Sequence, residues 1–294
     1  MAKKKKQKRF AQKTIALVYD FDGTLTPQPM QDCTLLKVLN ISPEAFWKEV
    51  RKENKKTNGD EILTYLRLLI KKANSAEVPL KPTDLKRLGG SIKYFPGVET
   101  WFRRINSYVK KVSRGKVKVK HYIISAGMKE ILNGIRIRKW FERIYGCEYF
   151  FDQDERPTFP KVVINATNKT QYLFRINKGR EELDESINEY MPEEERPIPF
   201  YNIVYIGDGM TDVPCMTVTK KSGGHAVAVH RKGGHKAFNV CKELLKAERI
   251  DYFAPADYGA GKILEKRVRL LLDLKVARIN HKQETFRCRR EASR

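Results

Sequence analysis

Short apolar runs alternate with amphipathic stretches along this chain. The first run, Thr14–Tyr19, is apolar without alternation, which is typical of a strand buried on both faces of a parallel sheet. Similar runs follow at 117–124, 145–151, 202–206 and 226–229, with a weaker one at 251–254. Helical spacing of apolar residues predicts helices at 98–112, 128–141, 169–176, 212–220, 236–246 and 261–276. This alternation predicts a doubly wound α/β fold, in which a parallel sheet carries helices on both faces and ligands bind at the carboxyl ends of its strands.

One region interrupts the alternation. Between Met30 and Gly90 no segment has the pattern of a strand, whereas helical patterns occur at 43–52 and 60–72. The Pro96-Gly97 turn signal marks the return to the sheet. We therefore expect a basic disordered tail (1–12), an α/β core in two pieces (13–30 and 91–276), an inserted all-helical domain (31–90) and a basic C-terminal extension (277–294).

Two smaller irregularities lie within the expected core. The polar segment 152–157, followed by the more apolar 159–164, predicts a hairpin flap on the sheet. Residues 178–199 are rich in Glu and Pro, which indicates an excursion of the chain over the surface.

The composition agrees with a globular protein and adds a strong positive charge. Of the 294 residues, 41% are hydrophobic, which is enough for a sizeable core. The formal net charge of +24 favours polyanions such as phosphorylated metabolites, nucleic acids or acidic membranes, or else reflects a host with basic proteins. The lysine-rich residues 1–9 fit a disordered tail better than a targeting signal, because no secretory apolar segment follows them.

The cysteines and the hydropathy bear on location. The five cysteines are scattered, without a Cys-x-x-Cys pair or a zinc-like spacing, and this indicates a reducing compartment. The chain has no apolar span of about 18 residues. We therefore expect a soluble, cytoplasmic protein with no membrane partner.

Two carboxylates stand directly after the first predicted strand. Asp20 and Asp22 repel each other at this spacing, and they remain ionised only if a cation neutralises them; oxygen ligands in a small site favour Mg²⁺. Gly23 allows a sharp turn. An EF-hand calcium loop is a poor alternative, because Thr24 and Gln31 occupy two of its ligand positions, but an ordinary Asx turn would also fit these residues.

A second acidic cluster follows the predicted strand at 202–206. Asp208 and Asp212 lie there in the segment Gly-Asp-Gly-Met-Thr-Asp. Because both acidic clusters cap strands of one parallel sheet, they can converge on a single metal ion. We therefore predict a Mg²⁺ site that includes Asp20, Asp22, Asp208 and Asp212.

A hydroxyl residue ends a third predicted strand. Ser125, Ala126 and Gly127 precede the predicted helix at 128–141. A hydroxyl and unpaired backbone N–H groups at a helix N-terminus can bind an anion, although Ser125 could instead be an ordinary N-cap. Together with the two acidic clusters, the anion site is the better interpretation.

These three strand ends, in this order, resemble the motifs of the haloacid dehalogenase-like superfamily. The resemblance extends over about residues 14–276 and rests on Asp-Phe-Asp-Gly-Thr at 20–24, on Ser125, on a lysine and on the cluster at 207–212. It implies that Asp20 is a nucleophile that forms an aspartyl-phosphate and that Asp22 is the general acid and base. It also implies that Asp20, the backbone carbonyl of Asp22 and Asp208 hold Mg²⁺, with Asp212 in support.

The resemblance also implies how the phosphoryl group is bound. Thr24, Ser125, Ala126 and Gly127 would contact it, and a lysine would neutralise charge between it and the nucleophile. Lys169 and Lys178 both offer that lysine. We favour Lys169, because it begins a predicted helix after a strand-like stretch, as in the family.

The inserted helical domain resembles a type 1 cap, and the arrangement is similar to phosphoserine phosphatase-like members. This implies a phosphatase of a small phosphorylated metabolite. A dehalogenase needs no second acid after the nucleophile, so Asp22 argues against one, whereas a phosphonate-cleaving relative would need a cap lysine, which this lysine-rich chain could supply. The alternative from another class is a protein that binds or processes nucleic acid through its basic tails.

Overall fold

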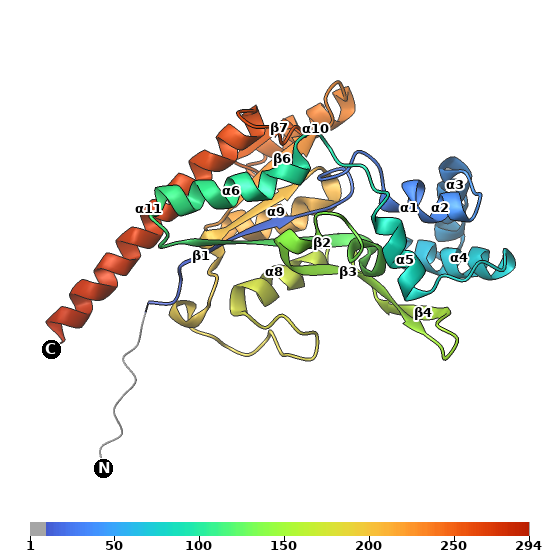
Figure 1. Cartoon of the computed structure of the whole chain (residues 1–294), viewed down its shortest axis with the longest axis horizontal. Helices are drawn as coiled ribbons and strands as arrows, with labels where there is room; N and C mark the ends of the chain where they lie inside the picture. The colour runs from blue at the N-terminus through green and yellow to red at the C-terminus, as the bar shows by residue number, and fades with distance from the viewer. Residues whose placement is uncertain (1–9, 294) are drawn as a thin grey trace, which may run out of the picture.

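The computed structural model describes residues 10–293. Within them, seven strands form one sheet in the order β4-β3-β2-β1-β5-β6-β7 (Figure 1). The strands are β1 Thr14–Tyr19, β2 Lys118–Met128, β3 Phe141–Phe151, β4 Pro157–Val162, β5 Ile203–Gly207, β6 His225–His230 and β7 Tyr252–Pro255. All neighbouring pairs are parallel except β3 and β4. The predicted doubly wound α/β fold is confirmed.

The strand order of the sheet reverses beside β1. The chain passes from β1 to β2 and β3 on one side, then returns to β5 on the other side of β1. Tyr19, the last residue of β1, pairs with Ile123 of β2 and Ile206 of β5. The strand order therefore reverses at the carboxyl end of β1, which is where open α/β sheets bind their ligands.

Helices cover both faces of this sheet. They are α6 Val98–Val112, α8 Lys169–Lys178, α9 Val213–Lys221, α10 His235–Lys246 and α11 Ile263–Ala292. Helix α6 packs on α11 and β2, while α8 packs on α9 and β2, so the two pairs form separate layers (Figure 1). Five of the predicted helices are confirmed, with α6 at its predicted ends.

The insertion after β1, all of which is described, contains five helices and no strand. Its helices are α1 Met30–Cys33, α2 Leu35–Val38, α3 Pro43–Thr57, α4 Glu61–Ser75 and α5 Pro82–Gly89. Side-chain caps start the two long ones, because Ser42 Oγ accepts the N–H of Ala45 and Asp60 Oδ1 accepts the N–H of Leu63. Figure 1 shows this insertion at one end of the sheet, beside the β3–β4 hairpin.

The predicted helix at 128–141 is wrong. Only α7, Lys129–Leu132, and the 3₁₀ turn η1, Arg138–Trp140, are helical there, while β2 continues to Met128 and β3 begins at Phe141. Gly134 interrupts the helix because it packs directly on α5: a Cβ there would lie 1.6 Å from the carbonyl oxygen of Lys86. Ile131, Leu132 and Ile135 are buried as the helical spacing predicts, but only the first two lie in a helix, the single turn of α7.

Within the described residues, the basic extension predicted after residue 276 is a continuation of helix α11. Helix α11 continues without a break to Ala292, and Ile279 is only 1% exposed. At the other end, residues 10–12 do not belong to a tail: Gln12 is buried and its Oε1 accepts the Tyr201 hydroxyl at 2.6 Å. Residues 1–9 lie outside the described residues.

The hairpin flap and the surface excursion are confirmed. β3 and β4 pair antiparallel around a turn in which Asp152 N–H donates to the Arg156 carbonyl at 3.0 Å. Between α8 and Pro199 the described chain contains no strand, only the 3₁₀ turn η2, Glu193–Glu195. The guanidinium of Arg175 holds this excursion by donating to backbone carbonyls within it, including that of Glu185 at 3.1 Å. Among residues 10–293, no helix is long and apolar enough to cross a membrane.

Candidate active site

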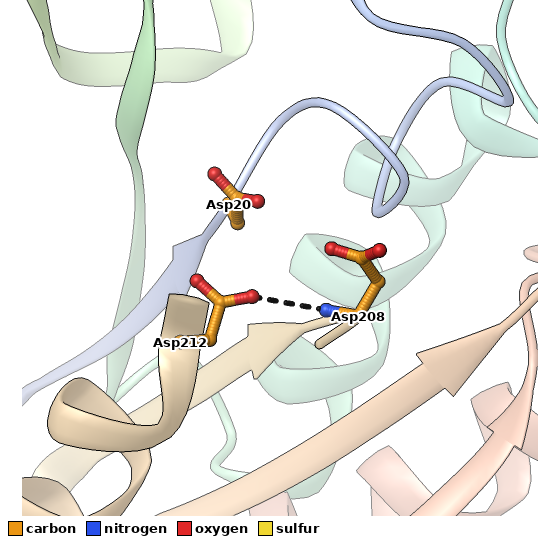
Figure 2. A group of neighbouring side chains, drawn as sticks. All are labelled: Asp20, Asp208 and Asp212. Atoms are coloured by element: carbon orange, nitrogen blue, oxygen red, sulfur yellow. Dashed lines mark hydrogen bonds between the residues drawn. The ribbon is translucent and has the colours of Figure 1, made fainter. Parts of the chain in front are cut away.

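Three carboxylates converge where the strand order reverses. Asp20 follows β1 directly, Asp208 follows β5, and Asp212 ends the 3₁₀ turn η4, Met210–Asp212. One carboxylate oxygen from each lies within 4.8 Å of the others (Figure 2). The acidic clusters predicted from separate parts of the sequence therefore form one group.

Two glycines make this convergence possible. A Cβ at Gly207 would lie 2.4 Å from Oδ2 of Asp212, and a Cβ at Gly23 would lie 2.3 Å from Oδ2 of Asp208. Gly23 also has φ of +79°, a conformation that favours glycine. A side chain at either position would push an acidic residue out of the group.

Lys169 connects two of the three carboxylates. Its Nζ lies 2.9 Å from Oδ1 of Asp20 and 2.9 Å from Oδ1 of Asp212, and its side chain is 2% exposed. Burial alone would lower the pKa of Lys169, but the two carboxylates outweigh burial and raise it, so the ammonium stays charged. Lys178, the alternative lysine, instead donates to the carbonyls of Ile187 and Glu189 in the surface excursion.

Hydrogen bonds from three donors hold the Asp212 carboxylate in place beside Asp20 and Asp208. Its Oδ1 accepts the hydroxyl of Tyr205 at 2.7 Å as well as Lys169, and its Oδ2 accepts the backbone N–H of Asp208 at 3.1 Å (Figure 2). With three donors on two oxygens, Asp212 fixes the positions of both Lys169 and the start of the 207–212 turn.

The carboxylates carry more negative charge than Lys169 balances. Burial, and then the charge of Asp212, raise the pKa of Asp20 to about 6. Burial, and then the charge of Asp20, raise the pKa of Asp22 to about 8 and that of Asp208 to about 8. A bound divalent cation would relieve this repulsion, and a donor set made only of carboxylate and carbonyl oxygens suits Mg²⁺, Ca²⁺ or Mn²⁺. The residues present therefore fit the predicted metal.

Asp22 lies beside this group but faces the helical insertion. Its Oδ1 accepts the backbone N–H of Met30, the first residue of α1, at 2.9 Å. Thr24 is fully buried in the same loop and its hydroxyl lies 3.4 Å from Oδ1 of Asp208. The hydroxyl of Tyr258 donates to the carbonyl of Thr24 at 2.9 Å, which fixes this loop on the core.

The environment of Ser125 differs from the prediction. Because β2 continues to Met128, Ser125 does not precede a helix, and it is not an N-cap. Its Oγ accepts the N–H of Gly127 at 2.9 Å, while the N–H of Met128 points to Sδ of Met30 at 3.2 Å. Ser125 lies near the carboxyl end of β2, and the N–H groups of Gly127 and Met128 both have partners, so a phosphoryl contact through this segment stays a prediction.

The insertion covers this end of β2 through side chains that the sequence analysis missed. The hydroxyl of Tyr65, from α4, donates to the carbonyl of Ala126 at 2.6 Å. A Cβ at Gly127 would lie 2.1 Å from Cε of Met30. Tyr205 was missed as well, although a tyrosine inside an apolar strand two residues before Gly207 signals a buried hydroxyl that needs a partner.

Comparisons with known proteins agree with this geometry. The family model of the haloacid dehalogenase-like hydrolases matches residues 17–217, a segment that contains all three carboxylates and Lys169. The chain belongs to this family of hydrolases. A protein of Borreliella burgdorferi, described only as uncharacterized, is 30% identical over 271 residues, which cover 84% of this chain and 92% of that protein.

Some solved structures are similar to this chain over most of its length. A phosphoserine phosphatase with an analogue of its phospho-aspartyl intermediate has a TM-score of 0.54 at 18% identity, over 88% of this chain and 99% of that one. A haloacid dehalogenase family hydrolase from Salmonella enterica serovar Typhi has a TM-score of 0.51 at 16% identity, over 81% of this chain and 66% of that longer one. At these identities the likeness concerns the fold alone.

Proposed function

We propose that this hydrolase is a Mg²⁺-dependent phosphatase that removes the phosphoryl group of a small phosphomonoester through an aspartyl-phosphate on Asp20. The observation that carries the proposal is the position of Lys169, whose ammonium lies between Asp20 and Asp212 at the carboxyl end of β1. There it can offset the charge that builds up between an anionic nucleophile and an anionic phosphate. Lys178 faces the surface excursion instead, so we assign the catalytic role to Lys169.

The proposed reaction has two steps. First, a carboxylate oxygen of Asp20 attacks the phosphorus, the bond from phosphorus to the ester oxygen breaks, and Asp22 gives its proton to that leaving oxygen. Then the Asp22 carboxylate takes a proton from water, the water oxygen attacks the phosphorus, and the bond to Asp20 breaks. Inorganic phosphate leaves, and both carboxyl groups return to their starting states.

The metal has a defined set of candidate ligands. Asp20, the backbone carbonyl of Asp22 and Asp208 would hold Mg²⁺, and Asp212 would support it from behind. When bound, the ion draws the phosphoryl oxygens towards the nucleophile and offsets their charge. Ser125, its neighbours Ala126 and Gly127, and Thr24 are the proposed contacts to the remaining phosphoryl oxygens.

We propose that residues 31–90 act as the cap of a core formed by 13–30 and 91–276. Tyr65 of this cap already contacts Ala126, and Met30, the core residue just before the cap, contacts Met128, so the cap lies over the carboxyl end of β2. A cap in this position excludes water and large substrates, which favours a small phosphorylated metabolite. All five cysteines are unpaired, in keeping with the proposed cytoplasmic location.

A substrate panel tests this function. The wild-type protein should release inorganic phosphate from at least one small phosphomonoester when Mg²⁺ is present and not when a chelator removes it. Asp20→Asn should lose this activity while it keeps the wild-type circular dichroism spectrum. Asp154→Asn, the same change in the exposed turn of the hairpin, is the matched control and should remain active. Equal activity in the Asp20 variant and the control would contradict the proposal.

A further inference from the structure

Two segments far apart in the sequence form a basic groove at the end of the molecule away from the cap. The groove lies between the turn that follows α6 and the last turns of α11 and has a volume of about 390 Å³. Arg114 and Lys116 line it from the turn, and Arg287 lines it from α11. Figure 1 shows the end of α11 passing beyond the sheet on the side opposite the helical insertion.

The charge around this groove is not balanced by nearby acids. Residues 110–118 contain five basic residues and no acidic one. Lys110, Lys111 and Lys118, close in sequence to the residues that line the groove, are exposed, and within residues 10–293 none of them forms an ion pair. Farther along α11, Arg289 and Arg290 are also exposed and form no ion pair with a described residue.

One acidic residue does reach the groove. Glu284 pairs with Arg287 at 3.1 Å, and both side chains are more than half exposed. An exposed pair three residues apart on a helix contributes little to stability, so Arg287 can exchange Glu284 for another anion at small cost. The lining of the groove therefore has three basic side chains and one acidic one, whose ion pair with Arg287 is weak.

The remaining lining residues favour one kind of polyanion. Asn280 and Gln283 of α11 lie in the groove beside the basic side chains, and amide side chains donate hydrogen bonds to phosphate and sugar oxygens. The surface is hollow and polar, whereas an acidic membrane presents a flat face. A nucleic-acid strand, whose phosphates repeat along a narrow backbone, fits this shape and charge better.

We infer that this groove binds the phosphate backbone of a nucleic acid, at a surface separate from the hydrolase site. β1 separates the two: Thr14 at its start pairs with Lys118 beside the groove, whereas Asp20 follows its other end. At about 3.3 Å per residue, the strand places the two surfaces roughly 20 Å apart. A polyanion bound in the groove therefore does not enter the catalytic site.

The test measures binding of a labelled single-stranded RNA of about 20 nucleotides to the full-length protein by fluorescence anisotropy across a salt series. The variant Arg114→Gln/Lys116→Gln/Arg287→Gln removes three groove charges from exposed positions. It should bind at least about tenfold more weakly, and the slope of log K against log salt should fall by about 2, since each lost contact with a single strand accounts for roughly 0.7. Phosphomonoester hydrolysis should not change.

The matched control removes the same charge elsewhere. Lys52→Gln/Lys55→Gln/Lys56→Gln changes three exposed lysines of α3 and should bind RNA as the wild type does. A further variant that lacks residues 2–9 separates the groove from the basic tail. Equal losses in the groove and α3 variants would overturn the inference, as would loss only in the tail deletion, or binding to phosphatidylserine vesicles but not to RNA.

Discussion

Lys169 brings a full positive charge into a part of the molecule that excludes water. Its ammonium is 2.9 Å from both Asp20 and Asp212, and Tyr205 supplies the third side-chain contact to the same acidic group. At the scale of single residues, the site is therefore a buried charge network in which each member depends on the others. Removing one partner leaves an uncompensated charge behind.

We predict that Lys169→Met destabilises the fold and abolishes hydrolysis. Removing one partner of a buried ion pair costs about 3–5 kcal/mol, because Asp20 and Asp212 then remain buried without a counterion. Urea unfolding in the presence of a chelator measures this loss. Lys178→Met is the control, since its amine contacts only backbone carbonyls of the surface excursion, and this variant should stay active. An inactive Lys178 variant with an active Lys169 variant would reverse our assignment.

Tyr205→Phe tests the hydrogen bond that the Tyr205 hydroxyl donates to Asp212. The change leaves a buried carboxylate without one of its donors, which costs about 1–3 kcal/mol of stability, and kcat should fall because Lys169 loses its fixed partner. Thermal unfolding and steady-state kinetics provide the two readings. Tyr190→Phe, at a side chain that is 86% exposed, is the control and should change neither. A Tyr205 variant indistinguishable from that control would show that the hydroxyl is dispensable.

The sequence predicts the acidic group better than it predicts what surrounds it. Asp20 and Asp208 follow apolar runs directly, and parallel strands bring their carboxyl ends to one edge, so convergence follows from local signals. Tyr65 comes from the insertion and Met30 immediately precedes it, and nothing local fixes how that insertion lies on the core. Such contacts depend on tertiary packing, which periodicity does not encode.

At the scale of elements, the β3–β4 hairpin and the segment that follows it contact the helical insertion through hydrogen bonds and packing. The hydroxyl of Tyr149, in β3, donates to the carbonyl of Leu66 in α4 at 2.9 Å, and Nδ2 of Asn165 donates to Oδ2 of Asp60 at 3.0 Å. Strand β4 packs on the same helix. The hairpin that was predicted as a surface flap therefore also packs against α4 and helps to hold the insertion on the core.

We predict that Tyr149→Phe loosens α4. Losing this buried bond costs about 1 kcal/mol and leaves the Leu66 carbonyl without that donor, so amide hydrogen exchange in α4 should accelerate. Tyr145→Phe is a matched control in the same strand, because its buried hydroxyl has no hydrogen-bond partner in the described structure. Equal exchange rates in the two variants would mean that the Tyr149 hydroxyl does not fasten the insertion.

Helices and strands were predictable from the sequence where one hydrophobic pattern, uninterrupted, covered the whole element. The uninterrupted apolar run of β1 and the amphipathic α6 have their predicted ends. The segment 128–141 was not predictable in the same way, because Gly134 packs on the backbone carbonyl of Lys86 in α5 and the helix stops after the single turn Lys129–Leu132. Helical spacing indicates which residues are buried, but it does not identify the conformation that buries them.

At the scale of the whole molecule, α11 has two parts with different roles. Its first half is anchored by Leu264, Val268, Leu272 and other buried residues, and Ile279 is the last buried apolar residue. Beyond that point the helix is stabilised mainly by its own backbone and by surface contacts, such as the ring of Phe286 lying 6.1 Å from that of Phe10. The positive charge at this end therefore contributes little to the core.

A chain that stops after Asn280 should fold and hydrolyse phosphomonoesters. Only partly buried and exposed side chains are lost, so we expect a cost of about 1–2 kcal/mol, measured by thermal unfolding. The same truncation removes one wall of the basic groove and should abolish RNA binding. An inactive but folded truncated protein would show that the two ends of the molecule are coupled, contrary to our account.

The central claim is that Asp20 becomes phosphorylated during turnover, and chemical trapping tests it most directly. Hydroxylamine displaces phosphate from an acyl phosphate and leaves a hydroxamate on the carboxyl group, which mass spectrometry of peptides locates. With a substrate and Mg²⁺ present, we predict a hydroxamate on Asp20, absent when either is omitted and absent in the unreactive Asp20→Asn variant. Active turnover with no hydroxamate on Asp20, or with one on another residue, would contradict the account.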